Sequence, residues 1–133
     1  MFQRSLLLGI VSGALAGVAG IIYARVYFKV TEADFSAVAS TFNIFAASLA
    51  GGIIAALGFI VLERSLKSNG EIVFNLLFTL LSFATLLKPI SHRLPLTIAS
   101  PELFPGMVIP MHFFPALGWY TLKPLFFRRK RTR

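Results

Sequence analysis

The chain has 133 residues, of which 56% are hydrophobic and only 14% are charged, and its formal net charge is +8. A soluble domain has about 25% charged residues, so this composition excludes an ordinary soluble fold and predicts one membrane-embedded domain over residues 1–133. The chain contains no cysteine, which excludes disulfides and thiolate chemistry. We expect no nucleic-acid partner, because the basic residues lie between and after the apolar segments, where membrane topology explains them.

Four uncharged apolar segments are separated by short charged ones. A helix needs about 20 apolar residues to cross a bilayer, and three of the segments reach that length. We therefore predict an all-α fold, an antiparallel bundle of four transmembrane helices in contact with the lipid bilayer. The predicted spans are residues 5–27, 36–62, 71–89 and 104–126.

The first span carries Gly9, Gly13 and Gly17 at four-residue spacing. Rows of small residues let membrane helices approach closely, so this row predicts a packing face. A cleavable signal peptide is the alternative, because Ala14–Ala16 resembles a cleavage site after a basic start. The apolar run nevertheless continues to Ala24, which favours an uncleaved anchor.

The second segment is the longest and repeats the small-residue pattern. Asn43, Ala47, Gly51 and Ala55 follow one another at four-residue spacing, and together with the nearby Ser40, Ser48, Gly52 and Ala56 they form a second small-residue face. We predict that Ala47 and Gly51 pack against the glycine row of the first span. Because the segment exceeds a bilayer crossing, it must tilt or emerge at one end.

The third span is the shortest, and polar residues share one of its faces. Asn75, Thr79 and Ser82 lie at positions i, i+4 and i+7, a spacing that predicts that they point toward the bundle interior. A loop with three prolines follows, at about Pro89–Glu102. Those prolines interrupt any helix.

The fourth span contains Pro105, Pro110 and Pro115 at five-residue spacing. The last two each remove an interior hydrogen bond, so we predict a proline-kinked helix. His112 lies between them and is the only ionisable side chain well inside an apolar segment, which makes it a candidate functional residue. Kinked helices can line cavities and offer freed carbonyls to a ligand.

Two interpretations of His112 remain open. In the first, it forms a ligand site with Asn43, Asn75 or Thr79. In the second, a neutral imidazole hydrogen-bonds one of these residues and joins the helices. Haem ligation together with His92 would require the loop before the fourth span to fold inward. We therefore expect no cofactor and no metal.

The basic residues predict the orientation. With four spans, nine of the thirteen lie on the side shared by the two termini and four lie on the other side. The positive-inside rule then places both termini in the cytoplasm. The tail, residues 127–133, is expected to attract anionic lipid head groups. The residues assigned this role are Arg128, Arg129, Lys130 and Arg131.

The step Pro110, Met111, His112 in the last span, with the glycine-rich first span and the basic end, resembles small four-helix bacterial membrane proteins of unknown function. The resemblance implies a multi-pass protein of the bacterial inner membrane and implies no activity. Small multidrug exporters are similar in size, but they depend on a carboxylate in the first helix. Residues 5–24 contain none.

No sequence feature indicates catalysis. The acidic residues lie in or beside loops, and the chain has no nucleophile elbow, zinc signature or phosphate loop. We therefore predict a non-enzymatic scaffold or accessory subunit that packs as a homo-oligomer or in a larger membrane complex. The alternative is binding or transport of a small or lipid-like ligand in a cavity around His112.

Overall fold

The computed structural model describes residues 1–127, and every regular element in that part of the chain is helical. The basic residues assigned to lipid head groups, Arg128 to Arg131, lie outside the described residues. The all-α prediction is confirmed. The elements are α1 (Phe2–Thr31), α2 (Thr41–Leu66), η1 (Lys67–Asn69), α3 (Gly70–Ala84), α4 (Leu87–Ser91), η2 (Pro101–Leu103) and α5 (Phe104–Phe126), where η marks a single 3-10 turn.

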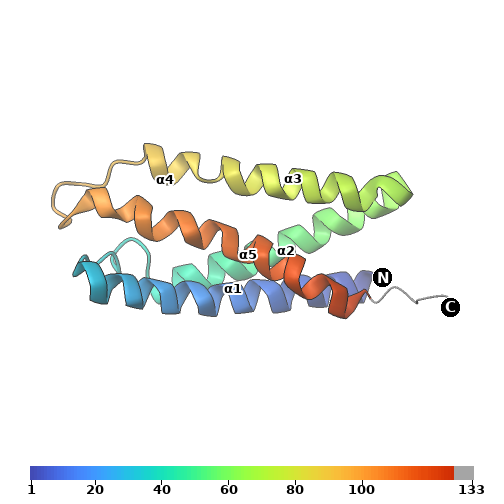
Figure 1. Ribbon diagram of the computed structural model, residues 1–133, viewed down its shortest axis with the longest axis horizontal. Helices are drawn as coiled ribbons and strands as arrows, with labels where there is room; N and C mark the ends of the chain where they lie inside the picture. The colour runs from blue at the N-terminus through green and yellow to red at the C-terminus, as the bar shows by residue number, and fades with distance from the viewer. Residues whose placement is uncertain (128–133) are drawn as a thin grey trace.

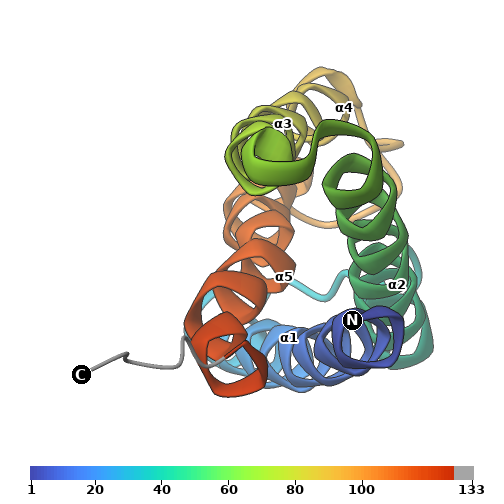
Figure 2. The same cartoon turned by 90° about the vertical axis from the view of Figure 1, so that its right-hand side faces the viewer.

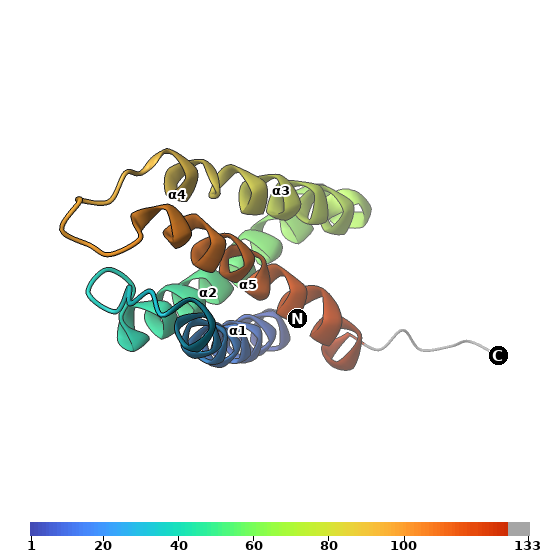
Figure 3. The same ribbon diagram turned by 60° about the vertical axis from the view of Figure 1, so that its left-hand side comes forward.

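The helices run back and forth along the long axis of the molecule (Figure 1). The N-terminus, the η1 turn and the end of α5 lie at one end, and the loops 32–40 and 92–100 lie at the other (Figures 1 and 3). Seen from the end, α1 has α2 and α5 on its two sides, and α3 lies across from it (Figure 2). α1 packs extensively on both neighbours, whereas α3 is held more loosely by α2 and α5.

Small residues form the contact between α1 and α2. A Cβ atom added at Gly13 would lie 2.8 Å from the carbonyl oxygen of Ser48, and one added at Gly9 would lie 2.6 Å from the Cβ of Ala56. The prediction that the glycine row of α1 packs against α2 is therefore confirmed. Gly9, Gly13 and Gly17 of this row are all buried, as is Gly20 on a neighbouring row.

Only part of the predicted small-residue face of α2 meets α1. A Cβ atom added at Gly51 would meet nothing within 4 Å, and Ala47 lines a cavity on another side of α2. The contact with α1 uses Ser48, Gly52 and Ala56 instead. Each lies one position after a member of the predicted row, and one position turns a helix by about 100°. The assignment of Ala47 and Gly51 to helix packing is therefore wrong.

Three predicted spans can be compared directly with single helices. The predicted span 5–27 lies within α1, which extends from Phe2 to Thr31. The predicted span 104–126 coincides with α5. The predicted span 36–62 begins too early, because α2 begins at Thr41. The hydroxyl of Ser40 accepts a hydrogen bond from the Asn43 N–H at 3.2 Å, and such a cap fixes the first helical turn.

The predicted span 71–89 is divided between α3 and α4. Pro89 has no N–H to donate to the carbonyl of Thr85, and its ring crowds that carbonyl. The hydroxyl of Thr85 also turns back to the carbonyl of Ser82 at 2.7 Å. The helix is interrupted at residues 85–86 and resumes as α4 in nearly the same direction (Figure 1).

Two buried clusters hold the helices together at opposite ends. Trp119 is the centre of the first, with its ring 5.5 Å from that of Phe59 and 5.2 Å from that of Phe74. The second cluster joins the two loops to the start of α5. Its members are Ala33, Phe35, Leu94, Phe104 and Met107.

Candidate functional site

α2 and α3 meet at the η1 turn and separate toward their other ends (Figures 1 and 3). The space between them, with α5 as its floor, is a cavity of about 630 Å³, called the cleft below. Its lining is mostly apolar, and Gly51 and Gly58 of α2 leave it room. Ile54 and Leu81 line the cleft and are exposed, so it is open between α2 and α3. The polar side chains that line it are Asn43, Ser48, Ser82, Thr85 and His112.

The structure brings together only part of the predicted ligand site. His112 and Asn43 both line the cleft, whereas Asn75 and Thr79 do not. The face of α3 that carries those two residues is turned toward α5 rather than into the cleft. Ser48, Ser82 and Thr85 were missed as lining residues, because spacing along one helix does not say which neighbour a face meets.

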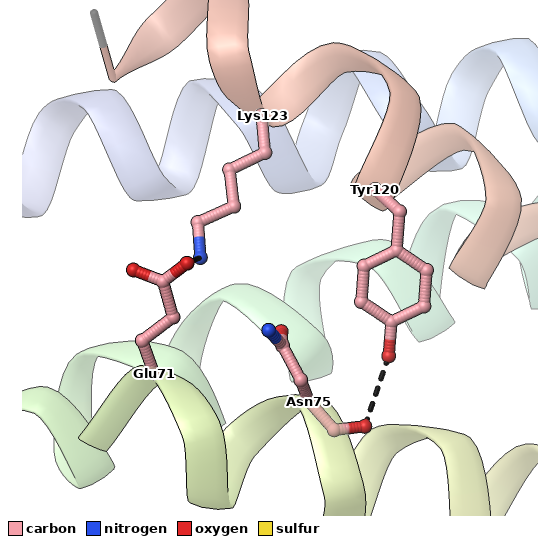
Figure 4. A network of polar contacts seen from close by, with 4 residues as sticks. All are labelled: Glu71, Asn75, Tyr120 and Lys123. Carbon is pink, nitrogen blue, oxygen red and sulfur yellow. Dashed lines mark hydrogen bonds and ion pairs between the residues drawn. The ribbon is translucent and has the colours of Figure 1, made fainter. Parts of the chain in front are cut away.

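Asn75 and Thr79 join α3 to α5 through Tyr120. The Tyr120 hydroxyl donates to the carbonyl oxygen of Asn75 at 3.0 Å (Figure 4). Since this uses the only proton of that hydroxyl, the Thr79 hydroxyl, 3.0 Å away, is the donor in their shared contact. Thr79 thus serves helix association through its side chain, whereas Asn75 does so only through its backbone carbonyl, and its side-chain Oδ1 is buried without a hydrogen-bond partner among the described residues. Neither residue lines the cleft, so their assignment to a ligand site with His112 is corrected.

The ring of His112 is oriented by its own helix. Its Nδ1 lies 2.8 Å from the carbonyl oxygen of Val108, one turn earlier. This bond replaces the predicted link from His112 to Asn43, Asn75 or Thr79, so the interpretation of His112 as a joint between helices is not supported. The second histidine, His92, is exposed at the end of α4 and does not line the cleft.

Tyrosines of α1 satisfy backbone groups of the proline-containing helix. Pro110 cannot donate to the carbonyl of Gly106, and the Tyr23 hydroxyl donates to that carbonyl at 3.1 Å. The Tyr27 hydroxyl donates to the carbonyl of Leu103 at 2.7 Å. These contacts fix the wall of the cleft formed by α5 against α1. A proline within a helix is the sequence signal for a freed carbonyl, although it does not identify the donor.

A partly buried ion pair joins the ends of α3 and α5 near η1 (Figure 4). Lys123 Nζ lies 2.8 Å from Oε1 of Glu71 and 4.7 Å from the centre of the Phe59 ring. The Lys123 side chain is only 12% exposed. No sequence signal identifies this pair, because Glu71 and Lys123 are distant in sequence.

A smaller cavity of about 180 Å³ lies where α1 meets the loop 32–40, lined among others by Arg25, Asp34 and Thr41. The backbone N–H of Ser36 donates to Asp34 Oδ1 at 2.9 Å, and the hydrogen bonds from Ser36 lower the pKa of the Asp34 carboxyl. The bonds shape the loop, and the cavity is too small for a lipid-sized ligand.

The described residues bring no three His, Asp or Glu side chains close enough to hold a metal ion. Comparison with known proteins found no matching protein family, no matching curated protein and no matching solved structure. Within the described part of the chain, the cleft is therefore the candidate site, and its chemistry has to be derived from its own residues.

Proposed function

We propose that this chain is a multi-pass membrane protein in which α1, α2, α3 with α4, and α5 each cross the bilayer, as one antiparallel bundle over residues 1–133. Phe2–Thr31 and Thr41–Ser91 are long and apolar enough to span a membrane. α5, with 23 residues, is about 35 Å long, which also matches a bilayer core. Large apolar side chains are exposed on all of these helices, as contact with lipid requires.

The proposed orientation places both termini in the cytoplasm of a bacterium, with the protein in the inner membrane. Arg4, Arg64 and Lys67 belong to the end of the molecule that contains η1 and the N-terminus, and Arg25 and Lys29 belong to the opposite end. With the basic tail counted, the first end carries the excess of positive charge that marks a cytoplasmic side. The tail would add attraction to anionic head groups there.

The orientation makes a direct prediction. Alkaline phosphatase, which is active only outside the cytosol, should be inactive when fused after Arg133 and active when inserted after Thr97. Reversed activities would contradict the orientation, and equal activities would contradict a membrane crossing by α5, which lies between the two fusion sites. The expression of both fusions is checked by immunoblotting, so that a low activity is not confused with a low amount of protein.

The function that the geometry supports best is binding of a lipid-like ligand in the cleft. One observation carries this proposal: the cleft is a mostly apolar cavity of about 630 Å³, the size of a ligand pocket, and it opens sideways between two helices. In a bilayer such an opening faces lipid tails, so that an amphiphile can enter from the membrane. Transport of the ligand would need a second opening, which the described residues do not show.

The scaffold role predicted from the sequence remains a prediction. Its main support was the two small-residue faces, and these faces now line contacts or a cleft within the chain. The glycine row of α1 is buried against α2. The row with Ala47 and Gly51 lines the cleft. Only this second row, which faces the open cleft, is left free to meet another molecule. We propose no catalytic role, because no arrangement of described side chains suggests a reaction.

Filling the cleft should abolish ligand binding without unfolding the protein. Gly51→Leu places a leucine in the cleft where a Cβ atom meets nothing within 4 Å. Ala50→Leu is the matched control, since Ala50 is exposed and does not line the cleft. Native mass spectrometry of the detergent-extracted protein should find a lipid-sized bound mass on the wild type and on Ala50→Leu. Occupancy should fall at least about tenfold in Gly51→Leu.

Two outcomes would count against ligand binding. One is a wild-type protein that carries no bound mass after extraction in several mild detergents. The other is equal occupancy of Gly51→Leu and Ala50→Leu, which would place the bound lipid elsewhere on the surface. Co-purification of a stoichiometric protein partner would instead favour the scaffold role.

A further inference from the structure

We propose that the ligand of the cleft is a lipid alcohol, meaning a hydrocarbon chain whose uncharged head group donates hydrogen bonds through a hydroxyl. This inference rests on the proposed function of the cleft and adds the chemical class of the ligand. It follows from which protons and lone pairs the lining residues have left to offer once their own helices are satisfied.

The cleft offers no charged side chain to a ligand. None of the residues that line it is Lys, Arg, Asp or Glu. The partly buried ion pair of Lys123 with Glu71 lies near η1, and neither residue lines the cleft. An ionised head group in apolar surroundings without a partner is strongly unfavourable. The head group that fits is therefore uncharged.

His112 presents a lone pair to the cleft. A carbonyl oxygen only accepts hydrogen bonds, so the Nδ1 that lies 2.8 Å from the Val108 oxygen carries the proton. In the neutral ring Nε2 is then an acceptor. No described residue donates a hydrogen bond to Nε2, and His112 is one of the residues that line the cleft. When the ring is neutral, this hydrogen bond leaves Nε2 as its acceptor.

The cleft-lining hydroxyls of α3, like Nε2 of His112, are available only as hydrogen-bond acceptors. Ser82 Oγ donates to the carbonyl of Phe78 at 2.8 Å, and Thr85 Oγ1 donates to the carbonyl of Ser82 at 2.7 Å. Each hydroxyl already donates its only proton to a carbonyl of its own helix, so toward a ligand its oxygen can only accept a hydrogen bond. Both residues line the cleft opposite α5.

The proline step of α5 adds a backbone acceptor. Pro115 has no N–H, so the carbonyl of Met111 loses its helical donor. The equivalent carbonyl at Gly106 is satisfied by Tyr23, but no described side chain donates to the carbonyl of Met111. Met111 and Pro115 both line the cleft. Three kinds of group on cleft-lining residues of two helices therefore have lone pairs that no described side chain uses, and the donors on the remaining wall are the Asn43 amide and the Ser48 hydroxyl of α2.

The polar groups are grouped at the wide part of the cleft. The rings of Phe83 and Phe113 are in contact, with centroids 5.2 Å apart, which places Ser82 and His112 at the same depth. Toward η1 the lining residues are apolar, among them Phe74. From Thr85 to Phe74 the wall of α3 extends about 16 Å. A hydroxyl beside His112 with a hydrocarbon chain directed toward η1 matches this division, and the amide of Asn43 can donate to the oxygen of that hydroxyl.

The test compares ligands that share one hydrocarbon chain and differ in the head group. Full-length protein in phosphatidylcholine nanodiscs is irradiated with hexadecanol that carries a diazirine in its chain, and the adducts are located by peptide mass spectrometry. Unlabelled hexadecanol, hexadecyl methyl ether and hexadecylamine are the competitors. We expect adducts on cleft-lining peptides and at least about tenfold weaker competition by the ether, which cannot donate a hydrogen bond.

Two variants test whether hydrogen-bond acceptors of the cleft cause the preference for the alcohol over the ether. His112→Phe keeps an aromatic ring and removes Nε2, and Thr85→Val keeps the shape and removes an oxygen. Either should bring the competition ratio of ether to alcohol toward one and leave competition by the ether within about twofold of wild type. Thr85→Val provides the test even if His112→Phe fails to fold. A wild-type ratio that survives in folded variants of both residues would overturn the assignment.

The outcomes separate the two proposals. Equal competition by alcohol and ether, or tighter binding of the amine, would overturn the lipid-alcohol inference and leave the binding role of the cleft standing. Adducts spread outside the cleft and unaffected by Gly51→Leu would overturn both. An isoprenoid alcohol and a monoacylglycerol, tested as separate competitors, share the required hydroxyl and distinguish the two natural sources. Failure of both to compete would contradict the inference.

Discussion

Replacing Gly52 with alanine should destabilise the protein by about 1–3 kcal/mol, the usual cost of overpacking a tight contact. The added Cβ atom would meet the carbonyl oxygen of Gly9 and would lie 2.9 Å from the Cα of Gly13. These are backbone atoms of α1, so no side-chain rotation can relieve the clash. The two helices would have to separate along their whole contact, which is the most extensive one in the molecule.

Gly51→Ala is the matched control for this prediction. It makes the same chemical change one position earlier in the same helix, where the new Cβ atom meets nothing within 4 Å. Its effect on the free energy of unfolding should stay within about 0.5 kcal/mol. Thermal unfolding followed by circular dichroism in one detergent compares the two variants. Equal stability of Gly52→Ala and Gly51→Ala would show that the contact between α1 and α2 differs from the one described.

The contrast between Gly51 and Gly52 also shows where sequence reasoning stops. Small residues at four-residue spacing identify a helix that can approach another helix closely, and α1 behaves as its glycines predict. α2 carries two such rows one position apart, and both satisfy the same spacing rule. The rotation of α2 decides which row meets α1. That rotation depends on packing against three helices at once, which no local pattern encodes.

Helix limits were predictable where local chemistry sets them. The span 104–126 and α5 agree, although α5 contains Pro110, Pro115 and Pro124. The carbonyl freed by Pro110 is satisfied by Tyr23 of α1. The sequence shows that a freed carbonyl needs a donor, but residue spacing does not show which residue of another helix supplies it.

The sequence predicted a ligand site around His112, but it identified only some of the residues that line the cleft. An ionisable residue within an apolar segment indicated the cleft through His112, and Asn43 also proved to line it. Asn75 and Thr79 share a face of α3, as their spacing predicts, but that face meets Tyr120. The acceptor character of the cleft depends on which group each hydroxyl donates its proton to, and only the three-dimensional structure shows that partner.

Trp119→Ala should have the largest effect on stability of any single substitution considered. Trp119 has no exposed surface, and its ring contacts those of Phe59, Phe74 and Phe78 at 5.5, 5.2 and 6.3 Å. Truncation of a buried tryptophan costs about 3–5 kcal/mol. We expect the lower end of that range if the chain spans a membrane as proposed, because lipid rather than water would then surround the separated helices and the loss would be mainly one of packing.

Trp119→Phe distinguishes packing from hydrogen bonding. The indole Nε1 is buried and has no hydrogen-bond partner among the described residues, so phenylalanine removes an unsatisfied donor as well as some volume. These effects oppose one another, and we expect a change within about 1 kcal/mol. Leu125→Ala, at a side chain 67% exposed on the same helix, is the control and should change little.

Denaturant titration followed by far-ultraviolet circular dichroism measures all three variants, since the chain has one tryptophan and fluorescence is lost with it. If Trp119→Ala lost less than about 1 kcal/mol, the cluster would not hold α3 and α5 against α2. The closed end of the cleft would then be unsupported, because Phe74 both packs on Trp119 and lines the cleft. A loss of about 3 kcal/mol in Trp119→Ala, with Trp119→Phe near wild type, would establish this cluster as the point where stability and the shape of the cleft depend on the same residues.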